Sequence, residues 1–127
     1  MKYLLDTCTV LWFFSGSVKC NPVSRGIIES ETAQKFVSVV SLWEFVMKNS
    51  TGKLQFDGGF ANFLELSKRN GFHVIPILRT HLEQLYRLPF HHRDPFDRLL
   101  VATAQTEDMT IVTSDADFRK YDVNILL

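Results

Sequence analysis

The stretch HHRDPFDRLLVATAQTEDMTIVTSD, residues 91–115, joins one predicted helix to one predicted strand. Asp94-Pro95 is typical of a helix N-cap followed by proline at the first helical position. The apolar and β-branched run Thr110 to Thr113 is typical of a short buried strand. This stretch is therefore one helix-then-strand unit of an α/β fold.

The same alternation extends outward over the rest of the chain. Further strands are predicted at Lys2 to Leu5, Phe36 to Val40 and Phe72 to Ile77, with helix-length stretches between them. Asn21-Pro22 predicts another capped helix start, and Asn70-Gly71 predicts a helix end. Strands without polar alternation are typical of a sheet buried on both faces. We therefore expect an α/β, three-layer fold with a mostly parallel sheet of about four or five strands and helices on both faces.

Composition places the chain among soluble single domains. It has 127 residues, of which 46% are hydrophobic, and 14 basic residues balance 14 acidic ones. We expect one domain over residues 1–127, with no long-range field that would attract a polyanion or a membrane. No apolar segment reaches membrane-spanning length, Met1-Lys2-Tyr3 does not resemble a secretion signal, and Cys8 and Cys20 lack metal-ligand spacing. A cytoplasmic protein with reduced thiols is expected.

Three acidic residues fall at or just beyond predicted strands. Asp6 follows the first strand, Glu44 lies just after the second, and Asp115 follows the fourth. Parallel strands end at one edge of a sheet, which is where open α/β sheets bind ligands. Carboxylates gathered there repel one another unless one takes up a proton or a cation lies between them.

Each of these acids also has a purely structural explanation. Asp6 could cap a helix that begins near Cys8. Glu44 could form a capping box with Ser41 and an i,i+4 pair with Lys48. Asp115 or Asp117 could cap a short turn before Phe118. Taken singly, none of them decides between a cap and a site.

Asp97 is harder to explain as a structural residue. Helical spacing places it on the same side as Leu100, Val101 and Ala104, and Asp94 already serves the helix N-terminus. An uncompensated carboxylate on a buried face costs several kcal/mol. A divalent cation shared with the three acids at the strand ends would compensate it.

The oxygen-only ligand set favours Mg²⁺ or Mn²⁺, because zinc normally recruits imidazole or thiolate. His91 and His92 are adjacent in a predicted loop and lack the i,i+4 spacing of helical zinc ligands, so we expect substrate contact or exposure for them. Magnesium held by few carboxylates commonly binds a phosphate as well, which points to phosphoryl chemistry.

The segments LLDT, SLWEFVMK, HRDPFDRLLVATA and IVTSDADF, in this order, resemble the PIN-domain ribonucleases, and among them the VapC-type toxins of prokaryotic toxin–antitoxin pairs. The resemblance implies metal-dependent endonucleolytic cleavage of RNA. By position it implies a catalytic, metal-binding cluster of Asp6, Glu44, Asp97 and Asp115. Asp117 and Asp94 are further candidate ligands, and Asp94 is also explained as a helix cap.

The implied chemistry makes further residues candidates for substrate contact. A metal-activated water would attack phosphorus in line and leave 5′-phosphate and 3′-hydroxyl ends. Thr7 and Ser114 are candidates to supply hydroxyls, and Lys48, Arg93 and Arg98 are candidates to contact the RNA backbone. Each of the three cations is equally well explained as a solvated surface residue.

Partners are implied more indirectly. The run VLWFF, residues 10–14, is apolar on every helical face, and a fully buried helix explains it best. An exposed groove that receives an antitoxin segment, or a second copy of the chain in a homodimer, is the alternative. Two further functions stay open: a metal-independent ribonuclease that uses His91 or His92, and a non-catalytic partner-binding module whose acids only cap helices.

Overall fold

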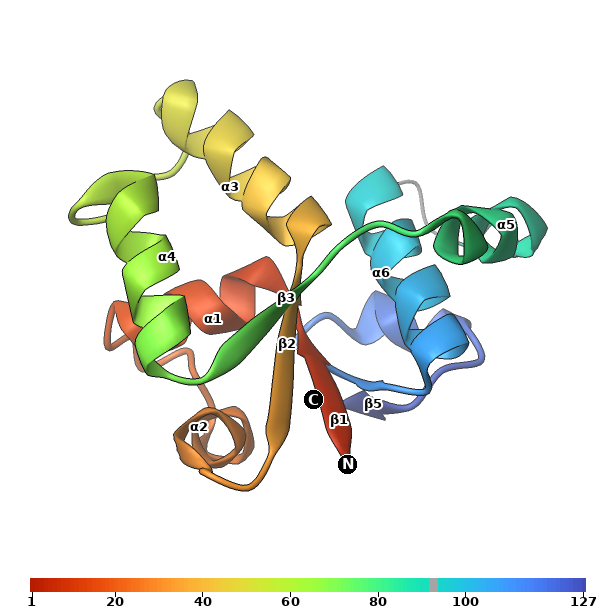
Figure 1. Ribbon diagram of the computed structural model, residues 1–127, viewed down its shortest axis with the longest axis horizontal. Coiled ribbons are helices and arrows are strands. Elements are labelled where there is room, and N and C mark those ends of the chain that lie inside the picture. The colour runs from red at the N-terminus through yellow and green to blue at the C-terminus, as the bar shows by residue number, and fades with distance from the viewer. Residues whose placement is uncertain (92–93) are drawn as a thin grey trace.

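The computed structural model describes residues 1–91 and 94–127, which form an all-parallel five-stranded sheet (Figure 1). At its centre β1 (Lys2–Leu5) pairs with β2 (Gln34–Ser38) on one side and β4 (Thr110–Val112) on the other. β3 (Phe72–Ile75) extends the sheet beyond β2, and β5 (Ile125–Leu126) extends it beyond β4. The order β3-β2-β1-β4-β5 brings the carboxyl ends of all these strands to one edge.

The connecting helices are capped largely where the sequence indicates. They are α1 (Thr7–Phe14), α2 (Pro22–Glu29), α3 (Val39–Ser50), α4 (Gly59–Arg69), α5 (Arg79–Arg87), α6 (Pro95–Glu107) and the 3₁₀ helix η1 (Ala116–Lys120). The Asn21 side chain accepts from the amide of Ser24, and the Asp94 side chain accepts from the amide of Phe96. Gly71, with φ of 75°, follows α4 in the left-handed conformation that glycine adopts readily.

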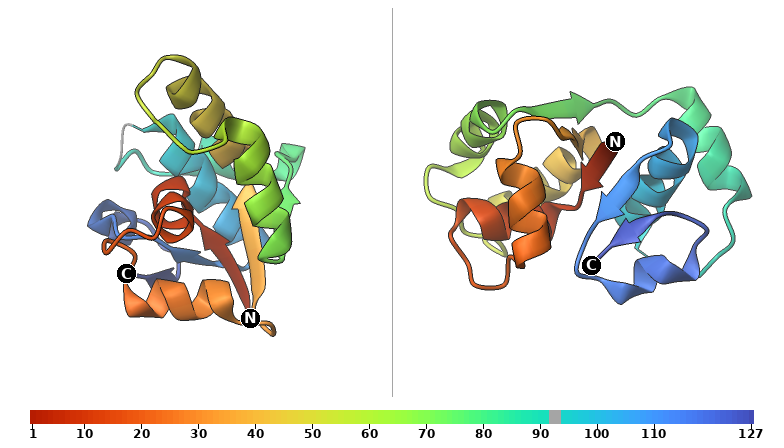
Figure 2. Two further views of the ribbon diagram at one scale, coloured as in Figure 1. Left: turned by 90° about the vertical axis from the view of Figure 1, so that its left-hand side faces the viewer. Right: turned by 90° about the horizontal axis from the view of Figure 1, so that it is seen from below.

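Two apolar clusters lie on opposite faces of the sheet, because successive strand residues point to opposite sides. Leu4 packs with α6 residues such as Val101 in one cluster, and Leu5 packs with Phe45 and Phe63 of α3 and α4 in the other. Figure 2 (right) shows α1, α2 and α4 on one side and α5 and α6 on the other. The predicted three-layer α/β fold, with helices on both faces, is confirmed.

The boundary between β2 and α3 differs from the prediction. The strand ends at Ser38 rather than Val40, and the helix begins at Val39. The Ser38 side chain accepts from the amide of Val40, so Ser38 is the N-cap and the predicted Ser41–Glu44 capping box is wrong. Two β-branched residues favour a strand locally, but the cap starts the helix earlier.

The helix α1 is not fully buried, in contrast to the main expectation for VLWFF. Val10 is fully buried, whereas Leu11, Trp12, Phe13 and Phe14 stay partly exposed. A helix at the end of a central strand packs one side against α3 and the sheet, and its other side faces outward. No helix among the described residues is long and apolar enough to cross a membrane.

Candidate active site

An acidic pocket of about 230 Å³ lies at the carboxyl edge of the sheet. It is lined by Asp6, Thr7, Cys8, Trp12, Glu44, Lys48, Asp94, Asp97, Leu100, Ser114, Asp115 and Phe118. The loops and helices that follow β1, β2 and β4, together with the start of α6, supply these residues. The fold therefore brings together the four acids implicated by the sequence, along with Thr7, Lys48, Asp94 and Ser114.

Asp6 is fixed at the base of the pocket by both carboxylate oxygens. Its Oδ1 accepts from the Thr9 amide at 2.8 Å, and its Oδ2 accepts from the Thr113 hydroxyl at 2.5 Å. The residue is 9% exposed, and burial raises the pKa of its carboxyl, an effect that the hydrogen bonds from Thr113 and Thr9 oppose and the charge of Glu44 reinforces. Asp6 is therefore both the N-cap of α1 and a buried acid of the pocket.

Thr113 is a site residue that the sequence analysis missed. Its buried hydroxyl donates to Asp6 and accepts from the amide of Asp115 at 3.0 Å. Parallel pairing of Leu5 with Val112 sets Asp6 beside Thr113, so this neighbour follows from the strand register. A strand-register argument applied to the predicted strands would have found it.

Asp97 lies among apolar side chains and other carboxylates in the pocket. Its neighbours Leu100, Val101 and Ala104 are buried as predicted. Desolvation first, and then the carboxylates of Asp94, Glu44, Asp6 and Asp115, raises the pKa of Asp97 to about 7. The carboxylates are thus close enough to oppose one another's ionisation, which is the electrostatic situation that a bound cation relieves.

Glu44 and Lys48 form the ion pair expected from their spacing. The Lys48 ammonium lies 3.1 Å from the Glu44 carboxylate, and Glu44 is the less exposed of the two. Desolvation acts to lower the pKa of Lys48, but the hydrogen bond and charge of Glu44 leave it raised. Lys48 therefore carries a positive charge at the wall of the acidic pocket.

The fourth strand places Asp115 in the pocket and Asp117 outside it. The Asp115 side chain accepts from the amide of Asp117 at 2.9 Å, which caps η1. Asp117 is exposed, lies 3.2 Å from the Lys120 ammonium and is not among the lining residues. Asp94 lines the pocket as well as capping α6.

The structure places Arg98 outside the lining of the acidic pocket. Its guanidinium is buried and donates to Pro89 O at 2.9 Å and to the Tyr121 hydroxyl at 3.3 Å. Successive residues of a helix are about 100° apart, so Arg98 leaves α6 in a different direction from Asp97. Arg98 therefore holds the segment at Pro89 in place, and its contact with an RNA backbone stays a prediction.

His91 also lies outside the pocket lining. Its amide donates to the Tyr121 hydroxyl at 3.2 Å, and its ring contacts the Tyr121 ring edge-on at 5.2 Å. Arg93 and His92, the other candidates in this loop, lie outside the described residues.

The donor set fits a hard divalent cation. Its acids offer only oxygen ligands, and the buried Thr7 hydroxyl, which lines the pocket, has no hydrogen-bond partner among the described residues. Within residues 1–91 and 94–127, no three His, Cys, Asp or Glu side chains already converge into a finished metal site.

Cys8 shares the pocket, but burial, followed by the charges of Asp6 and Glu44, raises the pKa of its thiol. A raised pKa keeps the protonated form at neutral pH, and the thiolate is the reactive species. Cys8 is thus not an activated nucleophile.

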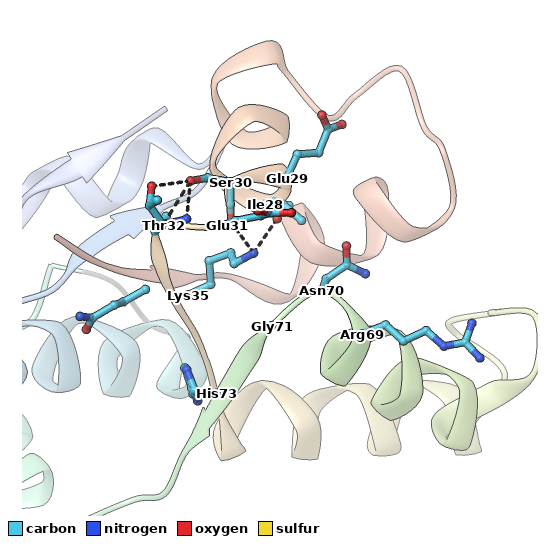
Figure 3. A pocket seen from close by; sticks show the side chains of 12 residues that line it. Ile28, Glu29, Ser30, Glu31, Thr32, Lys35, Arg69, Asn70, Gly71 and His73 are labelled. Atoms are coloured by element: carbon cyan, nitrogen blue, oxygen red, sulfur yellow. Dashed lines mark hydrogen bonds between the residues drawn. The ribbon is translucent and has the colours of Figure 1, made fainter.

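A second hollow, of about 520 Å³, lies at the opposite edge of the sheet, between the ends of α2 and α4 (Figure 3). The buried Lys35 ammonium there donates to Ile28 O at 2.7 Å and Ser30 O at 3.0 Å. These carbonyls belong to the end of α2, so Lys35 caps that helix. This hollow is structurally separate from the acidic pocket.

Comparison with known proteins agrees with this architecture. Residues 3–124 match the family model described as PIN domain. The chain is similar to VapBC2 from Rickettsia felis, in a crystal structure bound to a promoter DNA fragment, with 16% identity, 99% of this chain and 98% of that chain covered and a TM-score of 0.77. VapBC-1 from nontypeable Haemophilus influenzae is similar with 13% identity, 99% and 97% coverage and a TM-score of 0.71.

Mycobacterium tuberculosis VapC20, described as a Sarcin-Ricin loop cleaving toxin, is similar with 13% identity, 95% coverage of each chain and a TM-score of 0.69. No curated protein matches the chain in sequence. At such low identities the structural likenesses establish a shared fold, while the family model spans nearly the whole sequence. The chain belongs to the PIN domain family.

Proposed function

We propose that this protein is a Mg²⁺- or Mn²⁺-dependent endoribonuclease and the toxin of a type II toxin–antitoxin pair. The proposal rests on the position of Asp97, which is buried among four other carboxylates at the carboxyl edge of the sheet. Burial and these charges raise its pKa to about 7. A purely structural cap needs one carboxylate, and Asp94 already caps this helix. The accumulated negative charge is explained by a cation that binds among the acids.

Asp6, Glu44, Asp97 and Asp115 would hold the ion. When bound there, Mg²⁺ or Mn²⁺ would polarise the phosphodiester and lower the pKa of a bound water. Thr113 orients Asp6 and the backbone that carries Asp115, so it sets the spacing of two ligands from different strands.

In this proposal the substrate is bound by Lys48 and by the hydroxyls of Thr7 and Ser114. Lys48 lies at the pocket wall with its charge retained, where it can contact a phosphate oxygen. The hydroxyls of Thr7 and Ser114 lie in the same lining and can donate to phosphate or sugar oxygens.

An antitoxin partner is supported by the structural neighbours, since those from Rickettsia and Haemophilus are VapBC pairs. The partly exposed α1 and the exposed Trp43, Val46 and Met47 of α3 offer apolar surface for such a partner or for a second copy of this chain. We propose that the pair acts in the cytoplasm.

The test is cleavage of RNA by the purified chain with Mg²⁺, with Mn²⁺ and with EDTA. Asp97→Asn keeps the shape of the side chain and removes its charge, so we expect cleavage to fall at least 100-fold. Asp57→Asn, in the exposed loop between α3 and α4, makes the same chemical change away from the pocket and should cleave like wild type. Circular dichroism of both variants checks that they are folded.

Two outcomes separate the proposal from its rivals. Full cleavage in EDTA would support a metal-independent ribonuclease and overturn the metal-based mechanism. Absence of cleavage by wild type with either metal, on structured and unstructured RNA alike, would favour a non-catalytic binding module.

A further inference from the structure

We infer that Phe90 is a stacking platform for an unpaired nucleobase of the RNA, and that Arg98 is the positioning residue that holds it in place. This inference rests on the proposed function and names the part of the substrate that is recognised beside the acidic pocket. It depends on an exposed aromatic ring, on a buried cation beneath that ring, and on the position of that cation in the first turn of α6, whose N-cap Asp94 lines the pocket.

The Phe90 ring is 77% exposed, yet it does not project freely into solvent. The Arg98 guanidinium lies under it, 4.1 Å from the ring centroid, while Arg98 itself is 8% exposed. One face of the ring is therefore covered by a cation, and the other is open to solvent. A flat π-surface that is covered on one side and open on the other is suited to stack a base.

Arg98 is in turn fixed from several directions. It donates to Pro89 O at 2.9 Å, to Leu88 O at 3.5 Å and to the Tyr121 hydroxyl at 3.3 Å. No carboxylate in the described part of the chain forms an ion pair with it, so these oxygens and the Phe90 ring are what compensates its charge. A buried guanidinium with this many partners has little rotational freedom, and it holds the ring in one orientation before any ligand arrives.

This platform is connected to the acidic pocket through the first turn of α6. The Arg98 amide donates to Asp94 O at 3.1 Å and closes the first turn of α6, so the backbones of the two residues are about 6 Å apart along the axis. Asp94 lines the pocket. An RNA strand whose phosphodiester enters the pocket can therefore bring a flanking base onto Phe90, provided that the base is unpaired.

The alternative occupant of an exposed phenylalanine is an apolar side chain of a protein partner. The cation beneath the ring favours the base, because a guanidinium–aromatic pair extends naturally into a stack of flat groups, and because RNA bases present such groups in every sequence. A protein partner needs only apolar area, which any large aliphatic residue would supply as well.

The experiment compares Phe90→Ala, Phe90→Leu and Phe90→Trp in steady-state cleavage of an unstructured RNA that wild type cleaves. Loss of one stacked base corresponds to about a tenfold loss in binding, so Phe90→Ala should raise KM about tenfold with the change falling on KM rather than kcat. Phe90→Leu, which keeps apolar area without a flat face, should resemble Phe90→Ala, and Phe90→Trp should restore the wild-type KM. Tyr86→Ala removes an aromatic ring that is 91% exposed on α5 and is the matched control, with unchanged kinetics expected.

A second arm uses an RNA of the same sequence with abasic nucleotides flanking the cut. Wild type and Phe90→Ala should then have equal KM, since the base that distinguishes them is gone. Arg98→Met, which keeps the length of the side chain without the guanidinium, should raise KM on the intact RNA, and Phe90→Trp should not rescue it. The Phe90 variants alone decide the inference if Arg98→Met does not fold.

The inference is overturned if Phe90→Ala leaves KM unchanged, if Phe90→Leu behaves like wild type, or if the abasic RNA still distinguishes the two proteins. Weaker antitoxin binding by Phe90→Ala at an unchanged KM would assign the ring to the protein partner instead. Where wild type cleaves no RNA at all, the proposed function fails together with this inference; where wild type cleaves and Phe90→Ala is normal, the inference alone fails.

Discussion

The affinity of the acidic pocket for Mn²⁺ should rise about tenfold between pH 6 and pH 8. A cation competes with the proton on Asp97, whose pKa is raised to about 7, chiefly by burial and then by Asp94 and Glu44. With that pKa, about ten in eleven molecules carry the proton at pH 6 and about one in eleven at pH 8. Since the ionised carboxylate binds the metal, the apparent affinity should follow the ionised fraction.

Mn²⁺ binding is measured without RNA, by electron paramagnetic resonance of the free ion or by calorimetry, at several pH values and constant ionic strength. Asp97→Asn should bind Mn²⁺ more weakly and lose most of the pH dependence, whereas Asp57→Asn should retain the wild-type curve. An affinity that is the same at pH 6 and pH 8 in the wild type would refute the electrostatic reasoning, whatever the activity of the enzyme.

Three further predictions concern the fold and the support of the site. In EDTA, the stability that a protonated Asp97 contributes is fully present below about pH 4 and is lost as pH rises through its folded-state pKa of about 7. The melting temperature should therefore fall between pH 5 and pH 8, and Asp97→Asn should flatten this trend. A melting temperature that rises over this range in the wild type, and equally in Asp97→Asn, would contradict the prediction. Thr113→Val should lower cleavage about 10- to 100-fold while the protein stays folded, because it removes the hydroxyl that orients Asp6; a wild-type rate would show that Thr113 is dispensable. Phe45→Ala should cost about 3–5 kcal/mol in urea unfolding, since this ring is fully buried and stacks on Phe63 at 4.7 Å; a loss below about 1 kcal/mol would mean that the core repacks around the gap.

The sequence predicts the architecture well because buried parallel strands have a direct signature. Strands at Lys2–Leu5 and Thr110–Val112 and the caps at Asn21 and Asp94 can be recognised from local patterns alone. β5, only the two residues Ile125–Leu126, is too short to have a pattern of its own and is defined by pairing with β4. The start of α3 depends on whether Ser38 or Ser41 accepts the first amide, which local propensity does not decide.

The acidic residues of the site could be predicted from the sequence, whereas the residues that hold them and the neighbouring loop in place were harder to predict. Asp6, Glu44, Asp97 and Asp115 follow from strand ends and helix spacing, and the structure lines one pocket with all of them. Arg98 could not be placed from sequence, because its partners, such as Pro89 O and the Tyr121 hydroxyl, lie outside its own helix, 9 and 23 positions away. A charged residue beside a catalytic motif looks the same in sequence whether it faces the substrate or holds a loop.

The most direct test of the account is a crystal structure of the protein grown with Mn²⁺, with data collected at a wavelength that gives anomalous scattering from manganese. We expect an anomalous peak inside the acidic pocket, about 2 Å from carboxylate oxygens of the acids Asp6, Glu44, Asp97 and Asp115. A fully occupied peak elsewhere, or an empty pocket in which Asp97 is satisfied by a protein cation at millimolar Mn²⁺, would contradict it.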